Sequence, residues 1–273
     1  MDDDALFDIE IRLLLEAVLQ RWQHDFRDYA VASLRRRMRL AMVHFGCTRM
    51  AQLQDRVLHE PDVFAQMLPY FTVQVSEMFR DPPYFKALRD EVVPVLRTWP
   101  SIKVWVAGCS TGEEAWSMAI LLAEEGLLER SILYATDINP AALRSAEAGV
   151  YALDRIALFS RNYVAAGGRG SLSDHYTSAY GGAAFARRLK QQMVFADHSL
   201  ATDSVFSEVH LVSCRNVLIY FNRRLQGRAV GLFRDALVRG GFLGIGSRET
   251  LQFTEHAAAF EPVAGEQRIY RRL

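Results

Sequence analysis

The spacing of hydrophobic residues changes near residue 100, and this change divides the chain into two regions. In residues 5–70 the apolar side chains recur at helical spacing, and strand or turn signals are few. After residue 100, short apolar runs alternate with amphipathic segments, a pattern typical of a parallel α/β sheet covered by helices. The sequence therefore predicts a helical N-terminal region followed by an α/β domain.

The N-terminal region is predicted to contain four helices, and a fifth helix leads into the α/β domain. In the first helix, Ile9, Leu13 and Val18 are among the apolar residues expected on one buried face. The further helices are expected at 29–45, 48–58, 61–68 and 85–96. Because Pro82-Pro83 interrupts the helical pattern, it marks a boundary. The predicted organisation is a helical domain at 1–80, a linker helix at 81–100 and an α/β domain at 101–273.

The α/β region contains apolar runs that predict strands at 102–107, 132–136, 192–196, 210–213 and 242–245. Helices are expected between most of them, at 113–127, 140–149 and 223–238. Asn139-Pro140 is typical of a helix start, and Gly240-Gly241 is typical of a helix stop. The glycine-rich stretch at 162–190 does not fit this alternation. It predicts a small hairpin-rich insertion between strands, at about 160–190.

Composition narrows the class of protein without naming a ligand. The chain has 273 residues, of which 50% are hydrophobic, so it can bury a large core. A formal net charge of zero gives no argument for binding nucleic acid or a membrane surface. The three cysteines lie far apart, which predicts neither a metal site nor a disulfide framework and fits a reducing cytoplasm. No apolar run is long enough to insert into a bilayer.

The most informative motif is the turn that follows the first predicted strand. Gly108 and Gly112 allow the backbone to turn sharply there and to approach a ligand closely. Asp137 ends the next apolar run, where an acid can accept hydrogen bonds from both hydroxyls of a ribose. Asn216 follows the strand predicted at 210–213, so it is expected at the same sheet edge. Together these residues favour a site for a nucleoside-containing cofactor.

Two alternative interpretations of this turn remain. Gly108–Gly112 also fits the G-x-S-x-G nucleophile elbow of a hydrolase, with Ser110 as nucleophile and His210 or His256 downstream. No glycine-rich oxyanion loop precedes it, and several earlier strands are missing. The other alternative is purely structural. In that case Asp137 caps the helix at 140 and Asn216 holds a turn.

Several motifs, in a fixed order, resemble those of the CheR family of chemoreceptor methyltransferases. They are Met78-Phe79-Arg80-Asp81-Pro82 and the segments 107–114, 135–139, 149–151, 214–221 and 240–246. The resemblance implies a Rossmann-like, class I, S-adenosylmethionine-dependent methyltransferase domain with a small antiparallel β subdomain inserted, preceded by an all-α N-terminal domain. It also implies methyl esterification of glutamate side chains on the cytoplasmic helices of chemoreceptors. The second product is S-adenosylhomocysteine, and no metal is required.

The resemblance also implies roles for individual residues. Arg80 and Tyr220 would lie near the transferred methyl group as catalytic residues, although Arg80 could instead pair with Asp81 and Tyr220 could be a core residue. The residues expected to bind the cofactor are Gln74, Ser76, Arg80, Gly108, Glu114, Asp137, Ser199, Leu200, Asn216 and Val217. His198 lies next to the expected cofactor edge.

The chain departs from the family pattern at four of its motif positions. Gln74 and Ser76 stand where the family usually has asparagine and threonine, Met78 replaces a phenylalanine, and Ser199 replaces an asparagine. Loss of one neutral hydrogen bond costs on the order of 1 kcal/mol, so a lower cofactor affinity is expected.

Arginines on the second predicted helix suggest how a partner could be held. Arg35, Arg36, Arg37 and Arg39 form either a solvated face or a basic surface that attracts the acidic receptor helices. The insertion could also tether a receptor tail by adding a strand to its edge. We expect a cytoplasmic monomer associated with receptor arrays. The alternatives are a cofactor-binding adaptor or sensor without turnover, and a methyltransferase of a small molecule or of a non-motility signalling array.

Overall fold

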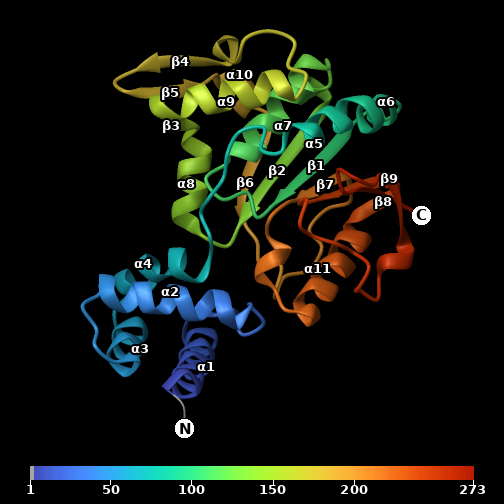
Figure 1. Ribbon diagram of the computed structural model, residues 1–273. Coiled ribbons are helices and arrows are strands. Elements are labelled where there is room, and N and C mark those ends of the chain that lie inside the picture. The colour runs from blue at the N-terminus through green and yellow to red at the C-terminus, as the bar shows by residue number, and fades with distance from the viewer. Residues whose placement is uncertain (1–2) are drawn as a thin grey trace.

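The N-terminal domain is a bundle of four helices, as predicted. A computed structural model describes residues 3–273, so the first two residues of the predicted domain lie outside the described residues. The helices are α1 (Asp3–Trp22), α2 (Val31–His44), α3 (Met50–His59) and α4 (Pro61–Phe71). Figure 1 shows them gathered beside the larger α/β domain. The bundle thus supplies a separate layer against one side of the sheet domain.

The buried face of α1 differs from the predicted one. Ile11, Leu14 and Val18 are buried, whereas Ile9 and Leu13 are exposed. Buried residues spaced at three, four and seven positions occupy one helical stripe, and Leu13 lies beside that stripe rather than in it. Sequence periodicity identified the helix correctly but placed its inner face partly wrong.

The linker helix is continuous from Pro82 to Leu96 but changes its hydrogen-bond pattern in the middle. It consists of α5 (Pro82–Ala87), the π-helical turn η1 (Leu88–Val92) and α6 (Val93–Leu96). Pro94 lies just after the wide turn, where a regular helix would place its ring against the carbonyl of residue 90. The π turn relieves this conflict and lets the helix continue along the sheet.

The α/β domain is built on a seven-stranded, mostly parallel sheet. Its strands are β1 (Ile102–Ala107), β2 (Ser131–Asp137), β6 (Met193–Asp197), β7 (Val209–Cys214), β8 (Leu237–Ile245), β9 (Phe260–Ala264) and β10 (Ile269–Arg272). The spatial order is β6-β2-β1-β7-β8-β10-β9, and β10 pairs antiparallel with both β8 and β9. All five predicted strands are present. The final antiparallel pair was not predicted.

The prediction that Gly240-Gly241 stops a helix is wrong. Helix α11 (Arg223–Ala236) ends earlier, and both glycines lie inside β8. A side chain on Gly241 would collide with the carbonyl oxygens of Val238 and His210, at 2.9 and 3.0 Å. The pairing of β7 with β8 shifts register at this point. The glycines therefore accommodate an irregularity in the sheet rather than a helix end.

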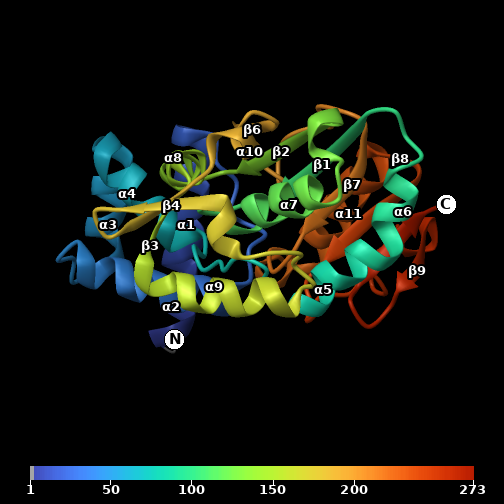
Figure 2. The ribbon, with the colours of Figure 1, turned by 90° about the horizontal axis from the view of Figure 1, so that it is seen from above.

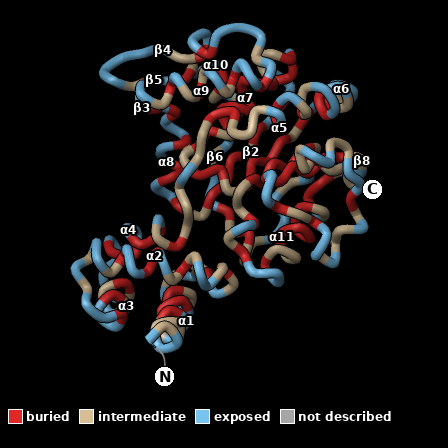
Figure 3. Tube along the Cα trace, viewed as in Figure 1, coloured by how far each residue is buried: buried red, intermediate tan, exposed pale blue. Residues whose placement is uncertain are grey.

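Successive side chains of β1 point to opposite faces of the sheet, and each face packs against a different set of helices. Val104 and Val106 pack with α7 (Glu113–Glu124) and the linker helix, whereas Trp105 and Ala107 pack with α11 and the N-terminal domain. This alternation follows from the two-residue period of a strand. Figure 3 shows the buried residues concentrated in the sheet and along the inner sides of the covering helices. The carboxyl ends of the strands thus meet the N-terminal bundle.

The insertion is an antiparallel subdomain, as predicted, but it begins earlier. Its strands β3 (Val150–Ala152), β4 (Tyr176–Ala179) and β5 (Gly182–Phe185) form a sheet in the order β3-β5-β4. Along the chain, helix α8 (Pro140–Ala148) leads to β3, and α9 (Leu153–Ala165) follows β3 and precedes β4. Figure 2 shows α9 from above, running from the side of β3 toward α5. The short helix α10 (Arg187–Lys190) returns to the main sheet. Within residues 3–273, none of the helices is long and apolar enough to cross a membrane.

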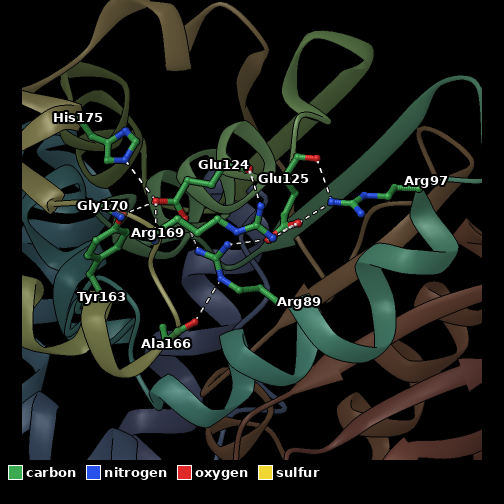
Figure 4. Close-up of polar contacts among 9 residues, drawn as sticks. All are labelled: Arg89, Arg97, Glu124, Glu125, Tyr163, Ala166, Arg169, Gly170 and His175. Carbon is green, nitrogen blue, oxygen red and sulfur yellow. Dashed lines mark hydrogen bonds and ion pairs between the residues drawn. The ribbon is translucent and has the colours of Figure 1, made fainter.

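An ionic cluster joins the insertion, the linker helix and the C-terminal end of α7 (Figure 4). Arg89 of the linker bonds Glu124 at 2.5 Å and Glu125 at 2.9 Å. Arg97 and Arg169 also pair with Glu125, at 2.7 and 2.9 Å. Glu124 is contacted by Tyr163 and His175 as well. We call this set the α7 C-terminal cluster. It links three segments far apart in the sequence.

Candidate functional site

A cleft lies at the carboxyl ends of β2, β1 and β7 and encloses about 850 Å³, part of it open to solvent. Every residue predicted to bind the cofactor lines this cleft, and so does Tyr220. These residues come from the segment 72–80, the turn after β1, the end of β2, the loop at 198–200 and the loop after β7. The structure therefore brings together residues that are separated by more than half of the chain. Ligands of open α/β sheets bind at this kind of edge.

The turn after β1 brings the backbone close to the opposite wall of the cleft. Gly108 has a φ angle of +71°, and a side chain there would lie 2.6 Å from Val217. Gly112 has a φ angle of +93°, and a side chain there would lie 2.7 Å from Ala146. Both positions require glycine for conformation and for space. The predicted sharp turn is therefore present, and α7 begins directly after it.

Asp137 ends β2 and is held by backbone amides. Its two carboxylate oxygens accept hydrogen bonds from the amides of Ser110, at 2.8 Å, and Asn139, at 2.9 Å. Burial raises the pKa of Asp137, and these amide donors oppose that shift. The alternative in which Asp137 caps the following helix is wrong, because the Asn139 side chain accepts from the amides at the start of α8. Asp137 therefore lines the cleft with a carboxylate that backbone amides hold in place.

The hydrolase alternative is also contradicted by the position of Ser110. Its hydroxyl donates to Gln74 at 2.7 Å, and Gln74 in turn donates to Thr72. His210 accepts from the amide of Lys103 at the opposite end of β1. No histidine among residues 3–273 is hydrogen-bonded to Ser110, so it has no general base. Through its bond to Ser110, the Gln74 side chain connects the segment 72–76 to the β1 turn.

Glu114 occupies the first turn of α7 and faces the loop after β7. It accepts hydrogen bonds from Ser213 at 2.6 Å and from Arg215 at 3.2 Å. Arg215 is buried and also pairs with Asp81 at 2.7 Å. The partner of Asp81 is therefore Arg215, and the alternative in which Arg80 pairs with Asp81 is wrong. Arg215 was not predicted as a functional residue, although it lies inside the motif at 214–221.

Asn216 has a left-handed backbone, with φ of +60°, and a side-chain oxygen that is buried without a hydrogen-bond partner. The backbone amide of Asn216 donates to the carboxylate of Glu249 at 3.0 Å, and the backbone amides of Ile219 and Gly246 donate to the same carboxylate. Burial raises the pKa of Glu249, whereas these amides lower it. Glu249 was missed, because nothing in its local sequence signals that it fixes a distant loop. The unpaired oxygen of Asn216 fits a ligand that offers a donor.

Arg80, Tyr220 and Tyr29 line another part of the cleft. Arg80 donates to the carbonyl of Val75 at 3.4 Å, and among residues 3–273 it pairs with no carboxylate. Tyr220 is half-buried, with the guanidinium of Arg37 5.7 Å from its ring centre. Tyr29, which was not predicted, comes from the loop between α1 and α2, and burial raises its pKa. The N-terminal domain thus contributes directly to the cleft.

His198, Ser199 and Leu200 form the remaining edge. The His198 ring packs edge-on against Trp105, and its Nε2 lies 3.1 Å from the carbonyl of Ser204. Ser199 is occupied locally, since its hydroxyl accepts from the amide of Ala201 at 3.3 Å. Leu200 is buried. Among residues 3–273, no cluster of histidine, cysteine or acidic side chains is arranged to hold a metal ion.

The four arginines of α2 do not form one exposed basic face. Arg35 pairs with Asp8 at 2.7 Å, and Arg39 pairs with Asp4 at 2.5 Å. Arg37 is buried and donates to the carbonyls of Ser33 and Phe71. Arg36 is exposed. The basic surface proposed to attract the receptor is therefore smaller than predicted, because acids of α1 neutralise the positive charges of Arg35 and Arg39.

Comparison with known proteins gives matches along nearly the whole chain. Residues 74–269 match the SAM-binding domain model of CheR methyltransferases, and residues 9–72 match the all-alpha domain model of the same enzymes. The chain is 57% identical over 272 residues to "Putative methyltransferase Cher3" of Pseudomonas putida, covering 100% of both chains. It is 30% identical over 193 residues to the chemotaxis protein methyltransferase of Listeria innocua, covering 68% of this chain and 69% of that protein.

Proposed function

The chain belongs to the CheR family of S-adenosylmethionine-dependent methyltransferases, and from this we propose that it methylates glutamate side chains of chemoreceptors. The substrates would be glutamates on the cytoplasmic helices of methyl-accepting receptors, and the products a glutamyl methyl ester and S-adenosylhomocysteine. The enzyme would act in the cytoplasm at receptor arrays, as a monomer. The name and extent of the Listeria relative support this proposal.

The observation that carries the proposal is the gathering of polar side chains in one cleft, including Asn216, whose side-chain oxygen is buried without a partner. Asp137 is buried at the end of β2, and Asn216 has an unpaired oxygen across from the β1 turn. Asp137 would accept from the ribose hydroxyls, while Asn216 and Val217 would contact the adenosine or methionine end. Glu114 and Arg80 would contact the cofactor from the remaining sides, along with Gln74, Ser76, Ser199 and Leu200. These side chains fit a nucleoside bearing an amino acid.

The chemistry requires positioning rather than a general base. A glutamate carboxylate is ionised at neutral pH, with a pKa of about 4.3. The cofactor supplies a methyl group on a positively charged sulfur that leaves as a neutral thioether. A carboxylate oxygen would accept this methyl group as the carbon–sulfur bond breaks, and no proton would need to move. The protein must hold the carboxylate in line with the methyl group and exclude water.

Arg80 and Tyr220 are the residues proposed to hold the acceptor. Arg80 pairs with no carboxylate among residues 3–273, so its guanidinium can bind the incoming glutamate through charge-assisted hydrogen bonds. Tyr220 lies in the same cleft and can orient the second carboxylate oxygen. Arg37 packs against the Tyr220 ring and would fix its position. Arg80 would thus serve both the acceptor and the cofactor, whereas Asp137, Asn216 and Glu114 would serve the cofactor alone.

The test is methyl transfer from radiolabelled S-adenosylmethionine to membranes that contain the chemoreceptors of the source organism. Treatment of the product with base should release volatile methanol, because a carboxyl methyl ester is base-labile. The Asp137→Ala variant should give no volatile counts. Radiolabel that stays on the protein after base treatment would instead indicate methylation of a group other than a carboxylate.

A second measurement separates the alternatives. Binding of S-adenosylhomocysteine without any transfer would favour an adaptor or sensor. Transfer to a small molecule, or to a signalling array unrelated to motility, with no label on chemoreceptors, would favour the other alternative. Either result would contradict the proposed substrate.

A further inference from the structure

Arg80 lies between two residues with an unusual backbone. Phe79 and Asp81 both have left-handed conformations, with φ angles of +50° and +53°. Residues other than glycine, asparagine and aspartate rarely adopt this conformation, so Phe79 in particular keeps it only because the surrounding structure holds it. Among residues 3–273 Arg80 pairs with no carboxylate and its guanidinium donates only to the carbonyl of Val75, at 3.4 Å, so the backbone on either side of it bears on its direction.

On the N-terminal side of Arg80, packing holds the backbone. The amide of Phe79 donates to the hydroxyl of Ser117 at 2.8 Å. The Phe79 ring is fully buried and lies against Phe85 and Tyr163, with ring centres 5.1 and 5.3 Å away. This half of the segment is thus part of the hydrophobic core.

On the C-terminal side, Arg215 holds the backbone. Its Nη2 donates to the carbonyl oxygen of Arg80 at 2.9 Å and to the carboxylate of Asp81 at 2.7 Å. The Arg215 side chain is 1% exposed and packs over the ring of Tyr84, 4.1 Å from its centre. Its Nη1 reaches Glu114 at 3.2 Å. One guanidinium therefore contacts both the backbone of Arg80 and a residue on the other side of the cleft.

We propose that Arg215, together with Asp81, is a positioning residue that sets the direction of the Arg80 side chain in the cleft. The inference rests on the proposed function, in which Arg80 holds the acceptor carboxylate. Arg215 does not itself touch the reacting atoms. It fixes the left-handed turn at Asp81 and links it to Glu114. The cofactor side and the acceptor side of the cleft are thereby held in one geometry.

The first test substitutes Asp81, which is less buried than Arg215. Asp81 is partly exposed, and asparagine is well tolerated in a left-handed backbone, so Asp81→Asn should fold normally. We expect kcat for receptor methylation to fall at least about ten-fold, because a small misplacement of a positioned group is costly. Because Arg80 also lines the cofactor side of the cleft, the affinity for S-adenosylhomocysteine should fall by clearly less than kcat does. Asp90→Asn is the control, since it removes an exposed ion pair from the same linker helix. Arg215→Lys, which keeps the charge but loses the fork geometry, should behave like Asp81→Asn.

A double variant distinguishes positioning from a general structural effect. If Asp81 acts through Arg80, Asp81→Asn should cause no further loss of kcat in an Arg80→Ala background. Losses that multiply would show that Asp81 acts independently of Arg80, and the inference would be wrong. An equal fall in cofactor affinity and kcat would also overturn it.

A third readout does not depend on the receptor substrate. The Nε–H signal of Arg80 can be followed by NMR in the complex with S-adenosylhomocysteine, assigned by its disappearance in Arg80→Lys. Asp81→Asn should shift or broaden this signal, whereas Asp90→Asn should leave it unchanged. If wild-type protein methylates no receptor, the proposed function fails and this signal still decides the inference. An unchanged signal in Asp81→Asn would refute it.

Discussion

The two ends of α7 carry the same pair of residues, two consecutive glutamates, in opposite settings. Glu113 and Glu114 occupy the first turn, whereas Glu124 and Glu125 lie at the last. At the first turn, each glutamate is paired with a single arginine, Arg155 for Glu113 and Arg215 for Glu114. At the last, three arginines surround the pair (Figure 4).

The helix dipole explains this difference. Carboxylates are stabilised near the N-terminus of a helix and destabilised near its C-terminus. The charges of Glu113 and Glu114 are therefore stabilised by the helix itself and need fewer neighbouring cations. This allows Glu114 to face the cleft. Glu124 and Glu125 are buried against an unfavourable dipole, so they persist only with several cations around them. One end of α7 can serve a ligand, while the other joins segments of the fold.

The comparison is tested most strongly by removing Glu125. Glu125→Ala leaves Arg89, Arg97 and Arg169 without this partner, and Arg89 is buried. Breaking a buried ion pair should lower the free energy of unfolding by about 3 kcal/mol. Urea denaturation measures this loss, and binding of S-adenosylhomocysteine to the folded variant should not change. Weaker binding would mean that the two ends are not independent.

Two glycines on either side of α7 give a matched pair of substitutions. Gly108 and Gly126 have nearly equal φ angles, +71° and +69°, but only at Gly108 would a new side chain meet a neighbour, Val217. Both alanine variants should lose about 1 kcal/mol of stability from left-handed strain. Gly108→Ala should also weaken cofactor binding about ten-fold, or about 1.4 kcal/mol, because it displaces a wall of the cleft. Calorimetry with S-adenosylhomocysteine distinguishes the two, and equal affinities would contradict the position of the site.

The α7 C-terminal cluster should also make stability depend on acid pH. Burial raises the pKa of Glu124, but hydrogen bonding by His175, Tyr163 and Arg89 outweighs it and lowers the pKa from 4.5 to about 2. A lowered carboxyl pKa stabilises the fold above the unfolded value, and this contribution is lost as the pH falls through the folded value. The denaturation midpoint should therefore decline between about pH 4.5 and about pH 2. Glu124→Gln should show a shallower decline, and an unchanged slope would rule out this assignment.

The smallest expected effect concerns the proposed partner surface of α2. Because Arg35 and Arg39 already pair with acids of α1, Arg36 is the arginine best able to attract an acidic receptor helix. Arg36→Glu should raise the apparent KM for the receptor roughly three-fold, as expected for a charge at an interface rim. The affinity for S-adenosylhomocysteine should not change. A KM equal to that of wild type would remove α2 from the proposed interface.

Much of the fold was predictable because its signals are local. The runs that form β1, β2, β6, β7 and β8 are apolar and bounded by turns, so their positions follow from the sequence. Strands β9 and β10 were missed because charged residues such as Glu261 and Arg271 interrupt their apolar pattern. Strand β3 is only three residues long, which is too short for an alternating pattern to be recognised.

The site was predictable where motifs carry it and obscure where it depends on distant contacts. The residues of the β1 turn, Asp137 and Asn216 lie at strand ends, so their meeting follows from parallel topology. Tyr29, Arg215 and Glu249 were not assigned. Each acts through a contact between segments remote in sequence, such as the carboxylate of Glu249 with the amide of Asn216. The same applies to the acids of α1 that neutralise Arg35 and Arg39.

One measurement tests most directly whether the cofactor binds at the N-terminal end of α7. It is calorimetric titration of S-adenosylhomocysteine into Glu114→Gln and Glu125→Gln, two substitutions of the same kind at opposite ends of one helix. Glu114→Gln should weaken binding about ten-fold, since it removes the charge that faces the cleft, while Glu125→Gln should bind as wild type does. Unchanged binding in Glu114→Gln, or an equal loss in Glu125→Gln, would contradict this location of the site.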